Sequence, residues 1–436
     1  MHTQQSNALK WILVVLLVVI CLICFILCMI KTGAAATNGG NAATTTVAKS
    51  DSEQNKNSEP SSILNPQPSD DAKITYSQFP RNATDYGDYK IGHIGGTNAD
   101  VFKNAFYFCG NYYVVIDTKS NDYDFDKCGI AVAIVKENSL IQTAVFASGE
   151  TYVKSDFING FITIVTKSEK LNVYSVSPTL SLVSKQEFDL DNVAFVESYG
   201  KTMAFGFKNN SLCAFNYSAV KSVFVSQTET TSSGEVLSVF KADGGYAIFA
   251  KTDGVRLYRY NGEFSLIDSI GGDYLDATLS TDYLAVVTND ANATLSVYGH
   301  DFSLIGVSTI DNFKSARFCP SNGGFVLVTD KGYYNLCKHF DVLKFKRFEG
   351  EYLSVTVATS NDSGLVLAQT DTSFDLIEFE NYGNYKIKNS FTSKPLEKRL
   401  FVTNGGCLAF FTVATMDGVF KDNFGDYETF WICYNK

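Results

Sequence analysis

The stretch TYVKSDFINGFITIVTKSEKLNVYSVSPTLSLVSKQEF, residues 151–188, contains four short runs rich in aromatic and β-branched residues. The runs cover residues 151–158, 161–167, 171–176 and 180–188. Val, Ile, Thr, Tyr and Phe favour extended strands, and a residue such as Gly160 permits a tight turn between two antiparallel strands. The stretch therefore predicts four consecutive antiparallel strands.

The same unit recurs along the chain beyond residue 88. In each copy a turn, usually with Gly, precedes a run of aromatic and β-branched residues. The turns lie at Gly110, Gly160, Gly200, Gly245, Asp282, Gly324, Gly364 and Gly406. Their spacing averages about 42 residues, which is the length of one four-stranded β-propeller blade. The repeat predicts an all-β domain, a β-propeller of eight four-stranded blades, or of seven if one irregular unit is misread.

The two ends of the domain predict how the ring closes. The last unit has only three strand-like runs, near residues 399–404, 406–414 and 427–434. Tyr89–Ile94, at the start of the domain, is a strand-like run without a hairpin partner. Pairing this early strand with the last blade would remove two free sheet edges, and we expect that closure.

The repeat resembles the β-propeller superfamily, in particular its WD40-like and quinoprotein-like groups and the scaffold propellers of outer-membrane assembly, over residues 88–436. No amphipathic helix pattern interrupts it, which disfavours α/β folds, and the rungs of a β-helix are about half as long. The Trp-Asp pair of WD repeats is absent, and Gly299-His300 is a lone dipeptide. Trp431 is the sole Trp of the domain, so the docking tryptophans of quinoprotein dehydrogenases cannot occupy every blade. The resemblance implies a fold and no activity.

An uncharged segment precedes the domain. Residues 11–30 carry no charge, and a helix of that length at about 1.5 Å per residue spans the roughly 30 Å of a bilayer core. We predict a short cytoplasmic tail at residues 1–10 and a transmembrane signal anchor at residues 11–31. A cleaved signal peptide is the alternative, since Ala34–Ala36 would suit a cleavage site, but the run is longer than a typical signal core.

The segment after the anchor has the composition of a tether. Residues 32–74 are mostly Ala, Thr, Asn, Ser, Gln and Pro, which cannot bury enough apolar surface to fold. We predict a disordered linker there, with a reach of roughly 35 to 40 Å, and the propeller domain at residues 75–436. Lys10 before the anchor favours an inside amino terminus, which predicts a single-pass protein of the cell membrane with an extracytoplasmic propeller.

The charge of the chain restricts its partners. The formal net charge is −10, and residues 1–74 hold equal numbers of Lys and acidic residues, so the excess acid lies in the propeller. An acidic domain lacks the basic face that releases counterions from polyphosphates. Nucleic acid is therefore not an expected partner.

The domain carries no motif for catalysis, for a metal site or for a cofactor, so we assign no catalytic residue, no metal and no cofactor. Its three histidines, His93, His300 and His339, are scattered over different units. Asp122, Asp124 and Asp126 form an alternating acidic run, but a calcium loop needs Gly at the sixth place and an acid at the twelfth. Lys127 and Ala133 stand at those places, which favours a solvated loop.

The domain has seven cysteines, an odd number. Strand order separates Cys109 from Cys128, and Cys319 from Cys337, by an intervening strand and puts them beyond disulfide reach. Cys407 and Cys433 fall on neighbouring antiparallel strands. They form the one pair for which a disulfide is predicted to be feasible.

Two long loops stand out among those that join second to third strands. They cover residues 119–127 in the first blade and 415–426 in the last. Closure of the ring makes these two blades neighbours. Both mix acids with aromatic residues: Asp122, Tyr123, Asp124, Phe125, Asp126, Phe420, Asp422 and Phe424. Aromatics give large contact area and acids select a basic partner, so we predict a partner-binding surface here, with solvated insertions as the alternative.

These features favour a membrane-tethered propeller that acts as a protein-interaction scaffold or binding module at the cell envelope, with another envelope or membrane protein as its partner. The alternative is a carbohydrate-active or lactone-active hydrolase whose carboxylates meet in the central channel. Two buried carboxylates about 5 to 10 Å apart at the channel mouth would favour the hydrolase. A plugged, apolar channel would favour the scaffold.

Overall fold

The computed structural model describes most of the chain after residue 83, all of it within the second of two units, Leu64–Lys436. The described residues are 84–85, 87, 89–94, 101–118, 129–136, 139–221, 223–230, 234–321, 324–336, 342–360, 363–380, 384–392, 395–403, 406–413 and 428–435. The predicted tail, anchor and linker lie outside them. Within these residues no helix has the length and apolar character needed to cross a membrane.

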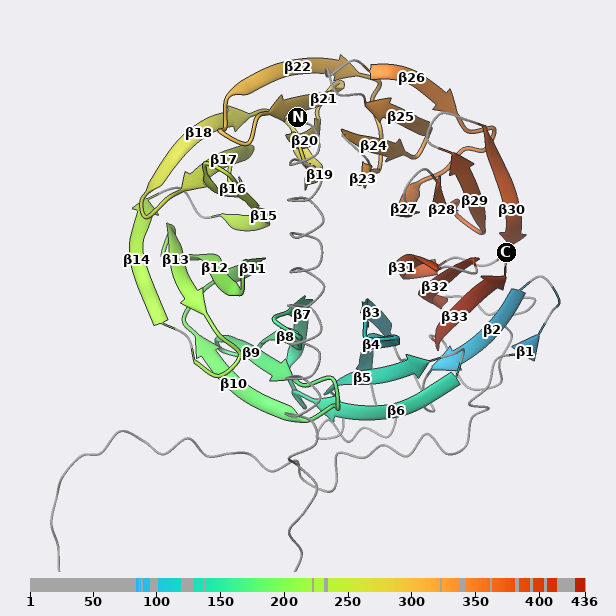
Figure 1. Ribbon diagram of the computed structural model, residues 1–436, viewed down its shortest axis with the longest axis horizontal. Coiled ribbons are helices and arrows are strands. Elements are labelled where there is room, and N and C mark those ends of the chain that lie inside the picture. The colour runs from blue at the N-terminus through green and yellow to red at the C-terminus, as the bar shows by residue number, and fades with distance from the viewer. Residues whose placement is uncertain are drawn as a thin grey trace, which may run out of the picture. The chain divides into compact units, whose positions relative to one another are not determined.

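The strands form eight antiparallel sheets arranged radially around a centre, and the chain is an eight-bladed β-propeller (Figure 1). Blade 1 consists of β3 (Val101–Phe108), β4 (Asn111–Thr118), β5 (Gly129–Lys136) and β6 (Ser139–Phe146), and blade 2 of β7 (Thr151–Ile158), β8 (Phe161–Lys167), β9 (Leu171–Val176) and β10 (Leu182–Phe188). Blade 3 consists of β11 (Asn192–Ser198), β12 (Lys201–Lys208), β13 (Ser211–Tyr217) and β14 (Val223–Thr230). Blade 4 consists of β15 (Glu235–Ala242), β16 (Gly245–Lys251), β17 (Val255–Tyr260) and β18 (Phe264–Ile270). Blade 5 consists of β19 (Asp273–Leu279), β20 (Leu284–Asn289), β21 (Ala293–Tyr298) and β22 (Leu304–Ile310). Blade 6 consists of β23 (Ala316–Ser321), β24 (Gly324–Thr329), β25 (Gly332–Leu336) and β26 (Val342–Arg347). Blade 7 consists of β27 (Ser354–Ser360), β28 (Ser363–Gln369), β29 (Phe374–Glu380) and β30 (Tyr385–Phe391). Blade 8 is β31 (Pro395–Thr403), β32 (Gly406–Val413), β33 (Glu428–Asn435), β2 (Tyr89–Ile94) and β1 (Thr84–Asp85).

The predicted blade boundaries agree closely with these strands. Every predicted turn lies at the start of the second strand of its blade, and the seven-bladed alternative is wrong. In blade 2 the first three strands match the prediction, whereas the fourth begins at Leu182 instead of residue 180. Leu180 adopts a left-handed backbone, with φ of 57°, so it belongs to the turn before β10.

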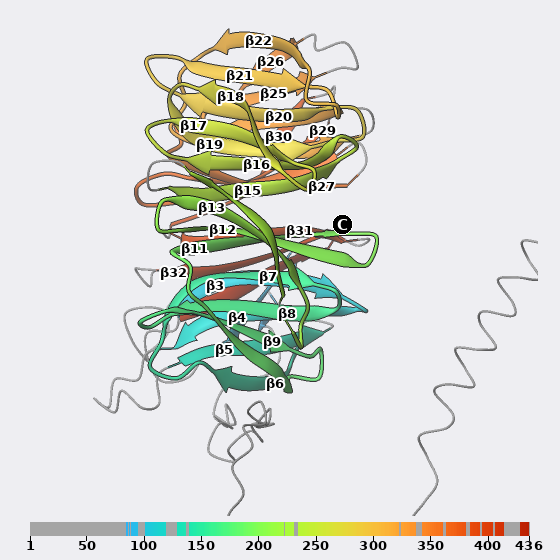
Figure 2. The same cartoon turned by 90° about the vertical axis from the view of Figure 1, so that its left-hand side faces the viewer.

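The ring closes as predicted, through the early strand. β2 pairs antiparallel with β33, from Tyr89 opposite Tyr434 to Ile94 opposite Thr429. The short strand β1, which the sequence did not indicate, adds a fifth strand beyond β2. Seen from the side, strands from the first and last parts of the described chain lie close together in the lower half of the view (Figure 2). Closure leaves blade 8 with strands from both ends of the domain.

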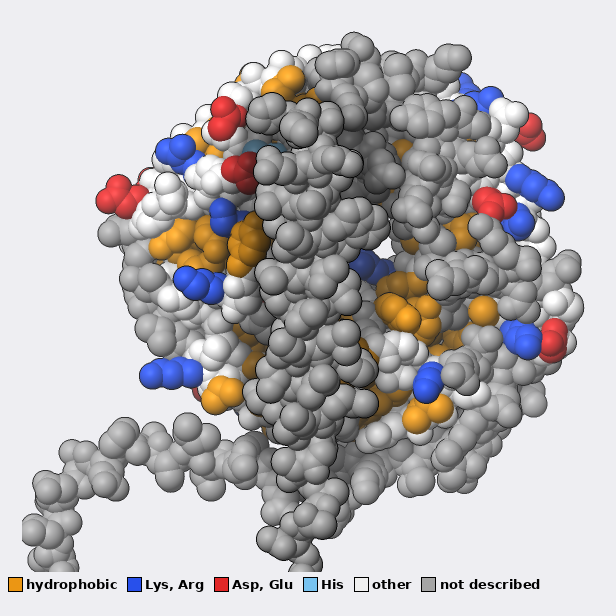
Figure 3. All heavy atoms as spheres, viewed as in Figure 1, with side chains coloured by type: hydrophobic (Ala, Val, Ile, Leu, Met, Phe, Trp, Pro, Cys, Tyr) orange, Lys and Arg blue, Asp and Glu red, His pale blue; other side chains and the backbone are white. Residues whose placement is uncertain are grey.

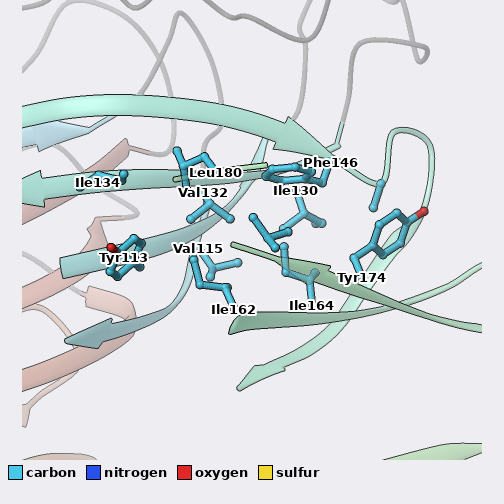
Figure 4. Packing of buried hydrophobic residues seen from close by; sticks show 12 residues of the cluster. Tyr113, Val115, Ile130, Val132, Ile134, Phe146, Ile162, Ile164, Tyr174 and Leu180 are labelled. Atoms are coloured by element: carbon cyan, nitrogen blue, oxygen red, sulfur yellow. The ribbon is translucent and has the colours of Figure 1, made fainter. Parts of the chain in front are cut away.

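The core consists of clusters packed between neighbouring blades. Between blades 1 and 2, side chains such as Val115 and Ile130 face Ile162 and Ile164, all 0% exposed (Figure 4). Inner strands such as β5 and β9 are buried along almost their whole length, because a neighbouring blade covers each face of the sheet. A side chain of this size contributes about 1.5 to 3 kcal/mol when it is fully buried. In fourth strands such as β18 and β22 most residues are partly or fully exposed, because these strands form the rim.

Cys407 and Cys433, the pair for which a disulfide was feasible, are not bridged. The strand register explains why. Cys407 lies opposite Tyr434, whereas Cys433 lies opposite Leu408. Residues opposite each other share a sheet face and successive residues alternate, so positions 407 and 433 belong to opposite faces of blade 8 by register. Cys109 and Cys319 form no disulfide either.

Candidate functional site

The eight residues of the predicted partner-binding surface lie outside the described residues, but the strands that hold their loops do not. β4 ends at Thr118 and β5 begins at Gly129, while β32 ends at Val413 and β33 begins at Glu428. Both loops therefore join second to third strands, as predicted. Blades 1 and 8 are neighbours, since β3 packs on β31, β32 and β33.

One hydrophobic cluster supports the strands on both sides of these loops. Phe102 of blade 1 stacks on Phe410 of blade 8 with ring centroids 6.2 Å apart. Ile116 near the end of β4 and Trp431 of β33 belong to the same cluster and are at most 1% exposed. Such packing fixes the ends of the strands, so the two loops emerge from a rigid frame.

A second candidate site is the central cavity, with a volume of about 1290 Å³. It is bordered mainly by first strands, which lie nearest the centre and contact one another around the ring (Figure 1). Its charged lining residues are Lys103, Asp276, Arg317, Lys398 and Arg399. Figure 3 looks down the axis and shows Lys or Arg side chains beside an opening near the middle of the ring. The cavity is thus neither plugged and apolar nor lined by paired carboxylates among its described residues.

β-Bulges position several of the lining residues. Within the described strands, β3, β7, β15, β19 and β31 each carry one extra residue near their start relative to the second strand. Asn104, Asp276 and Lys398 follow the bulges of blades 1, 5 and 8, and all three line the cavity. A bulge bends the strand and redirects the side chains beside it. The same local irregularity therefore supplies polar groups from three blades.

These polar side chains also connect neighbouring blades. Asn104 donates from Nδ2 to the Ser155 carbonyl at 2.9 Å, which links blade 1 to blade 2. The Asp276 carboxylate accepts the backbone N–H of Phe318 at 2.7 Å, which links blade 5 to blade 6. First strands have one edge without a partner strand, and side chains of adjacent blades satisfy part of it.

Asp276 is the sole carboxylate among the described residues that line the cavity. Burial raises the pKa of its carboxyl group to about 6, while the charge of Arg317 and the N–H groups of Phe318 and Ala277 act in the opposite direction. Removal from water disfavours the charged form of a carboxyl group. A lone acid of this kind lacks the second carboxylate that glycoside hydrolysis requires.

Lys398 and Arg399 are adjacent on β31 and therefore point to opposite faces of blade 8. Lys398 faces blade 7, where its Nζ donates to Ser354 Oγ at 2.9 Å and to Gln369 Oε1 at 2.5 Å. Arg399 faces the other way, with its guanidinium 6.0 Å from the centroid of the Phe401 ring. Burial lowers the pKa of Arg399, and the charge of Asp156 in blade 2 opposes that shift.

The sequence analysis missed the whole cavity lining. Its residues come from six blades, and neither Arg317 nor Arg399 belongs to a motif. The repeat did contain one indication of this lining. Polar residues in or just before first strands recur at intervals close to the length of a blade, and some of them bond the next blade. The Asp276 to Phe318 bond spans 42 positions and the Ser315 to Val355 bond spans 40.

His300 has a structural environment. Its Nε2 lies 2.9 Å from the Ser280 carbonyl, and its Nδ1 lies 3.6 Å from Asp243 Oδ2. The side chain of His93 and the whole of His339 lie outside the described part of the chain. In the part of the chain that is described, no group of three or more His, Cys, Asp or Glu side chains is arranged to hold a metal ion.

No protein-family model matches the chain, and no curated protein matches it. Solved structures do match. Hsv2 from Kluyveromyces lactis is 11% identical, covers 67% of this chain and 99% of its own, and has a TM-score of 0.43. The dihydro-heme d1 dehydrogenase NirN is 13% identical over 74% of this chain and 73% of its own, with a TM-score of 0.49. The acylaminoacyl peptidase of Pyrococcus horikoshii is 10% identical over 73% of this chain and 58% of its own, with a TM-score of 0.43. These resemblances are distant, and no residue of this chain takes a role from them.

Proposed function

We propose that this protein is a membrane-tethered β-propeller that binds another protein of the cell envelope and acts as a scaffold, without catalysis. The observation that carries the proposal is the shared frame of blades 1 and 8, which supports the two longest second-to-third loops of the ring. Rigid strands that present long loops are a common basis for binding surfaces.

The proposed contact surface consists of Asp122 to Asp126 in one loop and Phe420, Asp422 and Phe424 in the other. Tyr and Phe side chains supply contact area with little loss of conformational entropy, and acids steer a partner with a basic patch. An acidic surface on an acidic domain also disfavours anionic partners. The partner is therefore expected to be a protein with a basic face.

Shortening both loops to Asn-Gly hairpins is expected to lower crosslinking to the partner roughly tenfold or more, because both halves of the surface are removed. Crosslinking of the full-length chain in its own membrane, followed by identification of the captured proteins, measures this. A matched control is Glu263→Lys, an exposed charge in the β17–β18 turn on the opposite face of the ring. A folded double-loop variant that captures the same proteins in the same yield would contradict the proposal.

The tether is proposed from the uncharged residues 11–30 and the polar residues 32–74. A membrane-impermeant protease added to intact cells is expected to cut between residues 32 and 74 and to release a folded propeller fragment. Immunoblotting with and without lysis checks this result. If the chain is protected in intact cells and is cut only after lysis, the propeller faces the cytoplasm and the proposed orientation is wrong.

A hydrolase is not favoured. Carboxylate-based glycosidases use two acids on either side of the scissile bond, about 5 to 10 Å apart. The described lining of the cavity offers Asp276 alone, together with four cationic side chains. This set is suited to binding an anion more than to protonating and attacking a glycosidic bond.

A further inference from the structure

We propose that the central cavity is a second binding site, separate from the loop surface, and that it takes a saccharide carrying several carboxylate or sulfate groups. Among its described lining residues the cations are Lys103, Arg317, Lys398 and Arg399, and the one acid is Asp276. Lys103 also lies 3.8 Å from Asp117, which is not part of the lining. The whole chain has a net charge of −10. A cluster of positive charge inside an acidic protein concentrates the field in the cavity and attracts anions.

The cations form an arc over consecutive blades. Arg317 lies on β23 of blade 6, Lys398 and Arg399 on β31 of blade 8, and Lys103 on β3 of blade 1. Blade 7 lies between two of them and contributes polar groups such as Ser354. An arc of this length suits a ligand with several anionic groups along it more than a compact ion such as phosphate.

The two arginines retain donors for a ligand. Arg317 uses one nitrogen, Nη1, for both of its hydrogen bonds, to the carbonyls of Leu275 and Ala316 at 3.1 and 2.8 Å. Arg399 makes no hydrogen bond to any residue in the described ranges, and Asp156, whose charge acts on Arg399, already lies 3.0 Å from Lys154. Both arginines are exposed side chains of the cavity lining. A guanidinium with N–H groups left over can bind a carboxylate or sulfate through two hydrogen bonds.

The neutral part of the lining suits a sugar. Ser354 and Asn104 already bond neighbouring residues, and Gln369 accepts from Lys398 through Oε1. The Nε2 amide of Gln369 can still donate to a ring hydroxyl. Phe401 provides an apolar face beside Arg399, and its ring is held by Tyr112 with centroids 5.3 Å apart. Well-placed polar groups together with aromatic side chains are typical of small-molecule sites.

Calorimetric titration of the full-length chain in an uncharged detergent tests the proposal. The probes are hexagalacturonate, a heparin-derived hexasaccharide, neutral maltohexaose and inorganic sulfate. One equivalent of at least one acidic hexasaccharide is expected to bind, with an affinity that weakens as salt rises, and the tighter of the two identifies the anionic group. Absence of binding by both acidic probes would overturn the proposal, as would equally tight binding of maltohexaose or sulfate.

Variants locate the site. Arg399→Gln is expected to weaken binding of the acidic hexasaccharide roughly tenfold or more, and Arg399→Lys to weaken it less because the charge remains. Arg256→Gln is the matched control, since that residue pairs with Asp253 at the surface outside the cavity, and it should bind like the unaltered chain. Arg317→Gln provides a second test if Arg399→Gln does not fold. Equal losses in the cavity variants and in Arg256→Gln would show non-specific attraction and overturn the site.

Discussion

Gly92→Ala is expected to lower the free energy of unfolding of the propeller by about 1 to 3 kcal/mol or more, although it adds one methyl group. Gly92 lies directly opposite Trp431 where β2 pairs with β33. The indole ring covers the glycine so closely that a methyl group there would overlap it. Trp431 is 1% exposed and packs in the cluster shared by blades 1 and 8, so it has no room to move aside.

Chemical denaturation of the full-length chain measures this effect. The chain has two tryptophans, so a Trp11→Phe background leaves the emission of Trp431 as a reporter of the closure. Gly271→Ala is the matched control, because a methyl group at Gly271 would meet no atom within 4 Å. That control should change the stability by no more than about 0.5 kcal/mol.

A double-mutant cycle separates the clash from other causes. When Trp431→Phe shortens the ring system, Gly92→Ala should cost less than it does opposite Trp431, and far-ultraviolet circular dichroism can follow both unfolding transitions. If Gly92→Ala is as stable as Gly271→Ala, or if the effects of Gly92→Ala and Trp431→Phe are additive, overlap with the Trp431 ring is not the cause of the instability.

Asp276→Asn is expected to remove one pH-dependent contribution to the free energy of unfolding. That contribution becomes smaller as the pH rises, whereas in ordinary acid denaturation stability is lost as the pH falls. The folded-state pKa of Asp276 is raised to about 6 by burial, above its ordinary value of 3.8. Between these values the folded chain holds a proton that the unfolded chain has lost. The contribution of this residue to stability is therefore fully present below about pH 4 and is lost as the pH rises through 6.

The size of the effect follows from the shift. Two pKa units correspond to at most about 3 kcal/mol, and water in the cavity reduces this value. Asn keeps an acceptor for the Phe318 N–H but carries no charge. The stability of Asp276→Asn relative to the unaltered chain should therefore increase between pH 4 and pH 7.

Urea denaturation of both chains at several pH values gives this difference directly. Asp189→Asn is a suitable control, because the exposed Asp189 pairs with Lys208, which lowers the pKa of its carboxyl group. Its difference should be small and should run in the opposite direction, being lost as the pH falls. A flat difference for Asp276→Asn would show that the carboxylate is solvated by the cavity and titrates normally.

Local patterns were sufficient for most of the architecture. The turn at Gly160 and the runs on either side of it predicted β7, β8 and β9 with their exact bounds, because tight turns and β-branched residues specify hairpins within a few positions. Closure through Tyr89–Ile94 also followed from the sequence, since a three-stranded last unit and one unpaired strand leave a single economical pairing.

The sequence by itself thus determined the class of fold and the way the ring closes, and it favoured eight blades over seven. Each of these depends on contacts between residues near in sequence or on counting strands. Tertiary structure alone decided which side chains share the cavity. Arg317, Asp276 and Arg399 are brought together by the curvature of the ring, and a one-residue bulge redirects side chains that alternation would place elsewhere. The same reason explains why Cys433 is not bridged to Cys407: strand order makes the two positions neighbours, but register assigns them to opposite faces of the sheet.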